Sequence, residues 1–342
     1  MVDHRASLIC AVGTMCLALV VAGCTQDDTD SDSAVEITVA TSTTEPTTTT
    51  VVGTTTEPSG AVFEVIHIEA GDHTIPGIFT VPKAGHSNAE YPTVLMLHGF
   101  GADKDEGGDM FRRLAEKLEG AGYASLRIDF AGTGDSTQPW MQNNFDGMVA
   151  DATTALSWLS AHDSVDADRI GVHGWSIGGR VAATVAGSDD RVRTLSTWAG
   201  AIQDGTDGME IFFDRPFMDC TGDTALESLH QCAAANGSVL YDPYGTGPFE
   251  LSQAWFETMM ASQALTLVGG FNGPQLAVHG ELDSVVPPGV SRNAIARSGS
   301  SDATLRIIAG GDHAFGVYSR AGPGITAEQV LKITARWIED KL

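Results

Sequence analysis

Apolar residues follow two different periods along most of this chain. Residues 62–68 and 75–81 alternate apolar and polar side chains, as strands with one exposed face do, and residues 70–72 between them indicate a hairpin turn. Continuous apolar runs, typical of buried parallel strands, then alternate with segments whose apolar residues repeat at helical spacing. The predicted strands are residues 93–97, 123–129, 169–173, 192–198, 275–279 and 303–308, and the predicted helices are residues 109–121, 146–161, 177–186, 289–298 and 326–341. Repeated strand–helix units predict an α/β fold, a mostly parallel sheet with helices on both faces.

One long segment interrupts this alternation. Residues 200–272 are dense in aromatic and methionine side chains, with several glycines and prolines among them. We expect an inserted cap over the carboxyl edge of the sheet, where folds of this kind bind ligands. Its apolar side chains would line a substrate pocket or would build only the core of the cap itself.

The first sixty residues have a different composition. An apolar run from about residue 8 to residue 22 ends in Val-Ala-Gly-Cys at residues 21–24, and it is too short and too rich in small residues to span a membrane comfortably. It resembles a signal peptide with the lipobox of bacterial lipoproteins, in which the cysteine carries lipid and becomes the new N-terminus. We therefore expect a signal peptide over residues 1–23 and a lipid anchor on Cys24, with a plain secretory signal as the alternative.

The next segment, residues 24–60, is rich in Thr, Asp and Pro and has few large apolar side chains. Such a composition does not repay the entropy of chain ordering, so it predicts a disordered tether. The folded domain would then comprise residues 61–342. The expected location is the cell envelope of a bacterium, outside the cytoplasm, with the domain held at a membrane by its lipid.

Cysteine content and charge narrow the picture further. Outside the predicted signal peptide and Cys24, the chain has only Cys220 and Cys232, an even pair that predicts a disulfide in an oxidising compartment; two buried thiols are the alternative. The formal net charge of −25 excludes binding to nucleic acid, because a phosphate backbone needs clustered Lys and Arg.

Candidate chemistry begins with residues 174–178, which match the pattern G-x-S-x-G. The pattern follows a predicted strand and opens a predicted helix, which is the context of a nucleophilic serine on a sharp turn. The Ser176 hydroxyl would project above the sheet edge, and the backbone N–H of Ile177 would point to where an oxyanion forms. We therefore predict that Ser176 is a nucleophile.

A serine hydroxyl needs a base to take its proton and an acid to orient that base. In chains with this motif the acid follows the serine, and the histidine base follows the acid. Asp283 lies in the loop after the strand at residues 275–279, and His313 lies in a glycine-rich loop after the strand at residues 303–308. Loops that follow parallel strands meet at one sheet edge, so we predict that Asp283 and His313 converge on Ser176. Glu281 and Asp312 are the rival acids.

Two further loops follow predicted strands at the same edge. Residues 98–101 read His-Gly-Phe-Gly, and residues 132–136 read Gly-Thr-Gly-Asp-Ser. The second run lacks the lysine of a phosphate-binding loop, so we expect a tight turn that supports the first. We expect structural roles for His98 and His173. No pattern in the sequence indicates a metal or another cofactor.

Together these motifs, with His-Gly-x-x-Asp at residues 279–283 and Gly-x-Asp-His at residues 310–313, give residues 61–342 a resemblance to the α/β-hydrolase superfamily. The chain is most similar to the branch with bacterial cinnamoyl (feruloyl) esterases and serine-aminopeptidase-like or monoacylglycerol-lipase-like hydrolases. The resemblance implies an α/β-hydrolase fold with a cap, and hydrolysis of small carboxylic esters without a cofactor. It also implies a triad of Ser176, Asp283 and His313, with Phe100 N–H joining Ile177 N–H as oxyanion donor.

Two other functions remain open at this point. The same triad would cleave amides in an exopeptidase-like hydrolase, which needs an acid in the cap to hold a free amine; Glu210, Asp214 and Asp219 are available. A chain that kept the fold and lost turnover would be a surface binding lipoprotein. The sequence indicates no obligatory protein partner.

Overall fold

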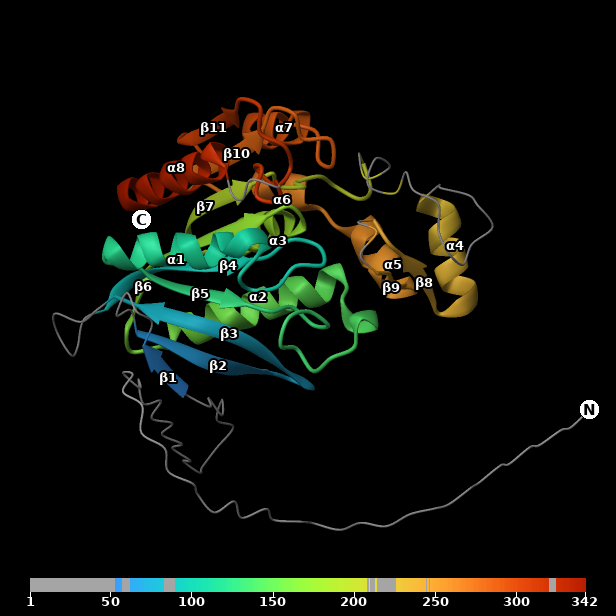
Figure 1. Cartoon of the computed structure of the whole chain (residues 1–342), viewed down its shortest axis with the longest axis horizontal. Coiled ribbons are helices and arrows are strands. Elements are labelled where there is room, and N and C mark those ends of the chain that lie inside the picture. The colour runs from blue at the N-terminus through green and yellow to red at the C-terminus, as the bar shows by residue number, and fades with distance from the viewer. Residues whose placement is uncertain are drawn as a thin grey trace, which may run out of the picture. The chain divides into compact units, whose positions relative to one another are not determined.

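A nine-stranded sheet runs through the part of the chain that the structure describes (Figure 1). This computed structural model describes residues 53–56, 62–82, 90–207, 209, 213, 226–243, 245, 247–319 and 324–342. The strand order is β1-β2-β3-β5-β4-β6-β7-β10-β11. The strands are β1 (Gly53–Thr56), β2 (Val62–Ala70), β3 (His73–Val81), β4 (Tyr91–Leu97), β5 (Ala124–Ile128), β6 (Val165–Trp175), β7 (Val192–Trp198), β10 (Gln275–Gly280) and β11 (Ala303–Ile308).

The sheet is antiparallel at one side and parallel through the rest. The predicted hairpin is present as β2 and β3, and β3 pairs antiparallel with β5. From β5 onward every neighbouring pair is parallel, which confirms the predicted fold class. The carboxyl ends of β4, β6, β7, β10 and β11 therefore share one edge.

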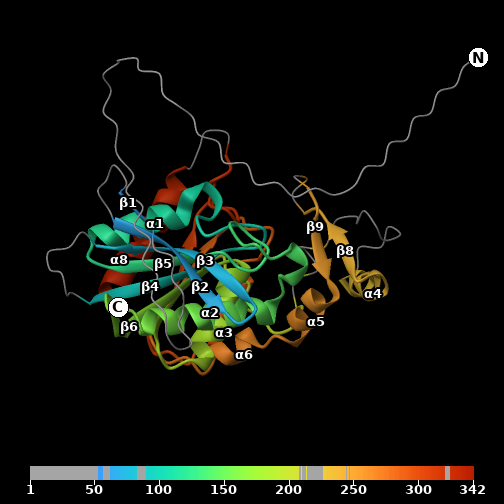
Figure 2. The same ribbon diagram turned by 90° about the horizontal axis from the view of Figure 1, so that it is seen from below.

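Helices cover both faces of the sheet, and strand β4 shows why. Its Val94 and Met96 belong to the core under α1 (Met110–Gly120) and α8 (Ile325–Lys341), while Leu95 and Leu97 belong to the core under α2 (Phe145–Ser160) and α3 (Ile177–Ser188). Successive side chains of a strand point to opposite faces, so a continuous apolar strand requires a layer on each side. Figure 2 shows these two layers. A further helix, α7 (Gly289–Arg297), packs beside β10 and β11.

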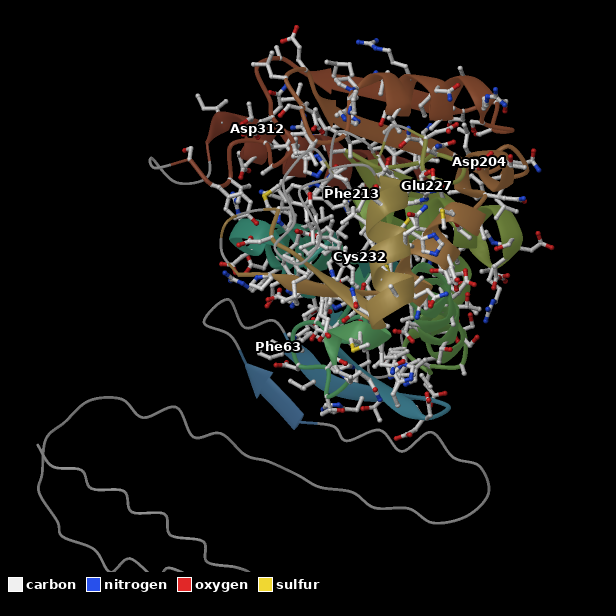
Figure 3. All side chains as sticks on the ribbon, turned by 90° about the vertical axis from the view of Figure 1, so that its right-hand side faces the viewer. Phe63, Asp204, Phe213, Glu227, Cys232 and Asp312 are labelled. Atoms are coloured by element: carbon white, nitrogen blue, oxygen red, sulfur yellow. The ribbon has the colours of Figure 1, made fainter. Side chains whose placement is uncertain are left out.

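The segment between β7 and β10 forms the predicted insertion. It contains α4 (Leu226–Asn236), the antiparallel hairpin of β8 (Ser238–Tyr241) and β9 (Phe249–Ser252), α5 (Gln253–Ala261) and α6 (Ala264–Val268). The first four elements lie at one end of the sheet (Figure 1), and Figure 3 shows α4, with Glu227 and Cys232, in front at that end. In contrast, α6 packs against α3 and so belongs to the helical layer.

Strand β1 lies inside the segment predicted as a tether. Residues 53–56 pair antiparallel with residues 62–65 of β2, and the threonine-rich composition did not predict this strand. Threonine is β-branched and fits an extended backbone, and strand pairing uses main-chain groups that any residue supplies. The predicted disorder of residues 24–60 therefore does not hold at β1.

Several predictions lie outside the described residues. These are the signal peptide, the lipid anchor at Cys24, the tether before residue 53 and Cys220, the proposed disulfide partner of Cys232. They stay predictions. Within the described ranges, no helix is both long and apolar enough to cross a membrane.

Candidate active site

Ser176 occupies a strained turn between β6 and α3. Its backbone has φ +55° and ψ −118°, values that few residues with a side chain adopt, and it is the N-cap residue of α3. The turn is held on both sides, because Ser176 N–H donates to Trp198 O at 2.9 Å and Ala201 N–H donates to Ser176 O at 2.9 Å. The structure thus places Ser176 on the sharp turn that the sequence predicts.

Glycines permit this turn because backbone passes very close to it. A Cβ on Gly178 would collide with the carbonyl oxygens of Leu97 and His98, and a Cβ on Gly174 would collide with the carbonyl of Gly178. The close approach lets the first turn of α3 sit against the end of β4. As the first residue of α3, Ile177 has an N–H without an intrahelical acceptor.

Asp283 and His313 meet in the loops after β10 and β11. His313 Nδ1 lies 2.8 Å from Asp283 Oδ2, and Asp283 Oδ1 accepts hydrogen bonds from Val285 N–H and Val286 N–H, both at 2.9 Å. Burial favours the neutral form of the Asp283 carboxyl, but hydrogen bonds from His279 and His313 outweigh burial, so its pKa lies well below its ordinary value. Asp283 is therefore a carboxylate that can orient an imidazole.

His279 is a second histidine on the same carboxylate, and the sequence analysis missed it. His279 Nε2 lies 3.0 Å from Asp283 Oδ2 and 2.8 Å from Val286 O, and its Nδ1 lies 2.7 Å from Ser291 Oγ. The ring is fully buried. Its position at the end of β10, four residues before Asp283, was the signal that could have indicated this contact.

The Ser176 turn and the His313 loop are joined through Trp175. The Trp175 indole N–H donates to His313 O at 3.2 Å, and its ring lies 5.7 Å from the ring of Phe315. The hydrogen bonds of the described residues include none between Ser176 Oγ and His313. The structure thus brings the two loops together, and the direct contact between base and hydroxyl is not formed in it.

The rival acids both lie in this region and neither contacts His313. Glu281 Oε2 accepts from Gly310 N–H at 3.0 Å, and Asp312 Oδ1 accepts from Gly316 N–H at 2.7 Å. Both side chains are exposed. Their hydrogen bonds shape the ends of the histidine loop, whereas the carboxylate that contacts the imidazole is that of Asp283.

The loop at residues 98–101 lies directly against Ser176. A Cβ built on Gly99 would be 3.5 Å from Ser176 Cβ, and Phe100 and Ile177 line the same pocket as Ser176. The two predicted oxyanion donors therefore lie at the same pocket as Ser176, the predicted nucleophile. The Phe100 ring packs edge-on against Phe249, at 4.9 Å between ring centroids, which joins this loop to β9 of the cap.

His98 has the structural role that was expected. Its Nδ1 lies 2.8 Å from Gly99 O, Phe130 N–H donates to its Nε2 at 3.2 Å, and Thr133 Oγ1 lies 3.0 Å from the same Nε2. Burial lowers the pKa of His98. The turn at residues 132–136 therefore supports the loop at residues 98–101 through this imidazole.

His173 is likewise a packing residue. It is fully buried, its Nδ1 lies 2.8 Å from Ser196 Oγ, and its ring lies 4.5 Å from that of Trp198. Burial lowers its pKa to about 3, so this imidazole is neutral at physiological pH.

Glu106 is a second site residue that the sequence analysis missed. Gly99 N–H donates to Glu106 Oε2 at 2.5 Å, and the Glu106 backbone has φ +60°. Burial raises the pKa of Glu106 to about 7, although hydrogen bonds from the N–H groups of Gly99 and Gly107 oppose the rise. A half-buried carboxyl thus holds the peptide next to the predicted oxyanion donor Phe100. No motif marks this residue in the sequence.

A pocket opens beside Ser176. Its lining is mostly apolar and combines the nucleophile turn, the loop after Asp283 and the cap. The lining residues are Phe100, Ser176, Ile177, Arg180, Ala201, Gln203, Met209, Trp255, Met259, Val285 and Val286. Trp255 and Met259 lie one turn apart on α5, so the cap contributes to the pocket and not only to its own core.

None of the described residues that line the pocket is acidic, and Arg180 is the one cationic residue among them. The three cap acids available for holding an amine, Glu210, Asp214 and Asp219, lie outside the described residues. Over the described ranges, no group of three or more His, Cys, Asp or Glu side chains is arranged to hold a metal ion.

Comparison with known proteins adds the following findings. The family model described as serine aminopeptidase, S33, matches residues 89–316, more than half of the chain. The protein YtaP of Bacillus subtilis is 29% identical over 143 residues, which cover 36% of this chain and 47% of YtaP. This chain spans about half the length, or less, of the curated relatives that it matches.

Two solved structures show the same fold at low sequence identity. Est1E from Butyrivibrio proteoclasticus, with ferulic acid bound, superposes with a TM-score of 0.64 and 18% identity over 80% of this chain and 98% of that chain. The esterase domain of a Rhodothermus marinus protein superposes with a TM-score of 0.57 and 20% identity, over 82% of this chain and 98% of that chain. Both likenesses support the sheet topology described above.

Proposed function

Because this chain belongs to the serine aminopeptidase S33 family and has the α/β-hydrolase fold, we propose that it is a serine hydrolase that cleaves carboxylic esters through an acyl-enzyme on Ser176. One observation carries the proposal. Ser176 lies on a strained turn at an apolar pocket, while the Asp283–His313 pair occupies the loops after the neighbouring strands β10 and β11.

The first step uses this arrangement as follows. His313 Nε2 takes the proton of the Ser176 hydroxyl as Oγ attacks the ester carbonyl, and the Asp283 carboxylate at Nδ1 stabilises the imidazolium that forms. The missing contact between His313 and Ser176 forms when substrate binds, since such hydrogen bonds often tighten only in the complex. Trp175 keeps the two loops within reach of each other.

The N–H groups of Phe100 and Ile177 then hold the oxyanion of the tetrahedral intermediate. Each donor of this kind lowers the barrier by roughly 3–4 kcal/mol in enzymes where one has been removed. His313 returns its proton to the leaving alkoxide, which departs as the alcohol and leaves the acyl group on Ser176 Oγ. Water, activated by His313, attacks the acyl-enzyme and releases the carboxylic acid.

The lining of the pocket favours an ester over the free amine of an aminopeptidase substrate. A substrate ammonium would meet the cation of Arg180 and, among the described lining residues, no carboxylate. The amide-cleaving alternative therefore depends on Glu210, Asp214 or Asp219. We also propose that the full chain is a lipoprotein of the bacterial envelope, anchored through Cys24; this rests on residues 21–24 following an apolar run.

The test of the activity is hydrolysis of a matched panel by the full-length chain. The panel contains p-nitrophenyl esters of two to sixteen carbons, methyl ferulate and aminoacyl p-nitroanilides, each also given to Ser176→Ala. We expect ester turnover that Ser176→Ala abolishes. Faster turnover of the anilides would favour the amide alternative. Failure of a fluorophosphonate to label Ser176 would favour a binding protein without turnover.

The test of the anchor is a comparison of two cysteine variants. Cys24→Ala should move the protein from the membrane fraction to the soluble fraction of expressing cells, and Cys16→Ala, in the same apolar run, should not. Equal distribution of the two variants would contradict the lipid anchor.

A further inference from the structure

A buried arginine lies one helical turn from the nucleophile. Arg180 is fully buried on α3, four residues after Ser176, and lines the pocket that contains Ser176. Helix α3 begins at Ile177, so Ser176 is its N-cap residue and Arg180 lies in its first turn. Both residues line one pocket, and the serine marks the place of the reacting carbonyl.

Among the described residues, the guanidinium has only neutral partners. Nη2 donates to Gly205 O and to Ser262 Oγ, and Nη1 approaches Met209 Sδ at 3.5 Å, a weak acceptor. Its Nε–H has no acceptor within the described residues. Two acids influence it only at longer range: Asp207, which is exposed, and Asp204, whose carboxylate accepts from Leu265 N–H at 2.9 Å.

A buried cation without a carboxylate is unfavourable, because the protein interior replaces little of its hydration. Burial lowers the pKa of Arg180 to about 10, so the group still carries its charge at neutral pH. Pockets that hold an unpaired charge in this way are suited to a ligand of opposite charge, which supplies the missing partner.

We propose that Arg180 binds a carboxylate at the far end of the acyl group, so that half-esters of dicarboxylic acids are the preferred substrates. The inference rests on the ester hydrolysis proposed above. The reacting carbonyl lies at Ser176, the methylene chain lies against the apolar lining, and the distal carboxylate accepts hydrogen bonds from Arg180.

The experiment compares two substrates with the same acyl length, p-nitrophenyl hexanoate and mono-p-nitrophenyl adipate, which differ only in the distal carboxylate. The full-length chain should show a higher kcat/KM for the adipate ester, by roughly tenfold to a hundredfold, since hydrogen bonds to a charged group are the stronger ones. In Arg180→Gln this ratio should fall to one or below, and Arg180→Lys should retain part of it. Free adipate should inhibit the wild-type chain more strongly than free hexanoate does.

Controls separate this inference from the proposed function and from misfolding. Arg306→Gln, which removes an exposed arginine, should keep the wild-type ratio. Circular dichroism and the melting temperature report whether Arg180→Gln is folded, and inhibition of the wild-type chain by adipate does not depend on any variant. A wild-type preference for the hexanoate ester, or a ratio unchanged in folded Arg180→Gln, would overturn the inference and leave ester hydrolysis intact. Turnover of neither ester would overturn the proposed function itself.

Discussion

His279 Nε2 lies 3.0 Å from Asp283 Oδ2, the same oxygen that His313 contacts at 2.8 Å. Both neighbours of His279 Nε2, the Asp283 carboxylate and Val286 O, are acceptors, so Nε2 carries a proton. His279 therefore donates to the Asp283 carboxylate and positions it from within the core, while His313 contacts the same oxygen.

We expect His279→Phe to lower kcat roughly tenfold to a hundredfold, because it removes a hydrogen bond to a charged group. His279→Gln keeps an N–H donor and should recover part of this loss. KM should change less than kcat in both variants. Equal losses of kcat in His279→Phe and His279→Gln, at equal melting temperatures, would indicate that only the volume of the imidazole ring matters.

The identity of the acid can be tested with three variants, each of which replaces one carboxylate by the corresponding amide. Asp283→Asn should lower kcat by roughly 10³- to 10⁴-fold, because it no longer stabilises the imidazolium. Glu281→Gln and Asp312→Asn remove the exposed carboxylates that contact the ends of the histidine loop, and they should retain most of the activity. A loss in Asp312→Asn as deep as that in Asp283→Asn would reassign the acid.

Glu106 makes the stability of the protein depend on pH. Its pKa rises from 4.5 to about 7 on folding, so the folded state favours the neutral carboxyl. Stability from this group is present below pH 4.5 and is lost as the pH rises through about 7, by about 3 kcal/mol in total. The charge of Asp103 adds to the rise in the pKa of Glu106, and burial together with the charge of Glu106 raises the pKa of Tyr318.

Glu106→Gln should remove this dependence, since an amide does not titrate and can still accept from Gly99 N–H. The measurement is the free energy of unfolding in urea between pH 4.5 and 8.5. The variant should lose less stability than the wild-type chain over this range, and Glu116→Gln, at an exposed position of α1, should follow the wild type. Parallel curves for wild type and Glu106→Gln would contradict the assignment.

Gly178→Ala tests the close contact beneath Ser176. The added Cβ collides with the carbonyls of Leu97 and His98, so α3 must move away from β4. We expect a loss of roughly 1–3 kcal/mol in stability and a larger loss in kcat, because the nucleophile moves with its helix. Gly120→Ala, where a Cβ meets nothing within 4 Å, is the control and should leave both quantities near their wild-type values.

The length of the pocket can be tested on α5. Met259 lines the pocket, whereas its neighbour Met260 is 39% exposed. Met259→Ala should shift the preference among neutral p-nitrophenyl esters toward longer acyl chains, by about fourfold in kcat/KM for each methylene that fills the new space. Met260→Ala should keep the wild-type profile. An unchanged profile in Met259→Ala would place the acyl group elsewhere.

The sequence predicted those parts of the site whose signal is local. Ser176, Asp283 and His313 each follow a recognisable apolar strand, and parallel strands bring such loops to one edge. Glu106 acts through contacts that nothing in its neighbouring residues encodes, whereas the contact of His279 was indicated only by its place four residues before Asp283. Arg180 lies at a helical position, and the direction of its side chain depends on tertiary contacts with Gly205 and Ser262.

The fold was predicted to a similar extent. Strong apolar periods located the strands and helices of the sheet layers, because burial on a defined face requires those periods. Strand β1 was missed because its pairing with β2 uses main-chain groups. The hairpin of β8 and β9 was missed because aromatic side chains dominate the insertion and mask any alternation.

The position of β10 and β11 in the sheet has a consequence for biogenesis. During synthesis, Ser176 is made directly after β6, and more than a hundred further residues are added before His313. Strand β10 then pairs with β7, from which the whole insertion separates it in sequence. Pairings between such distant segments are slow steps of folding. A nascent chain thus carries the proposed nucleophile without its base, and ester turnover should begin only when the last strand has joined the sheet.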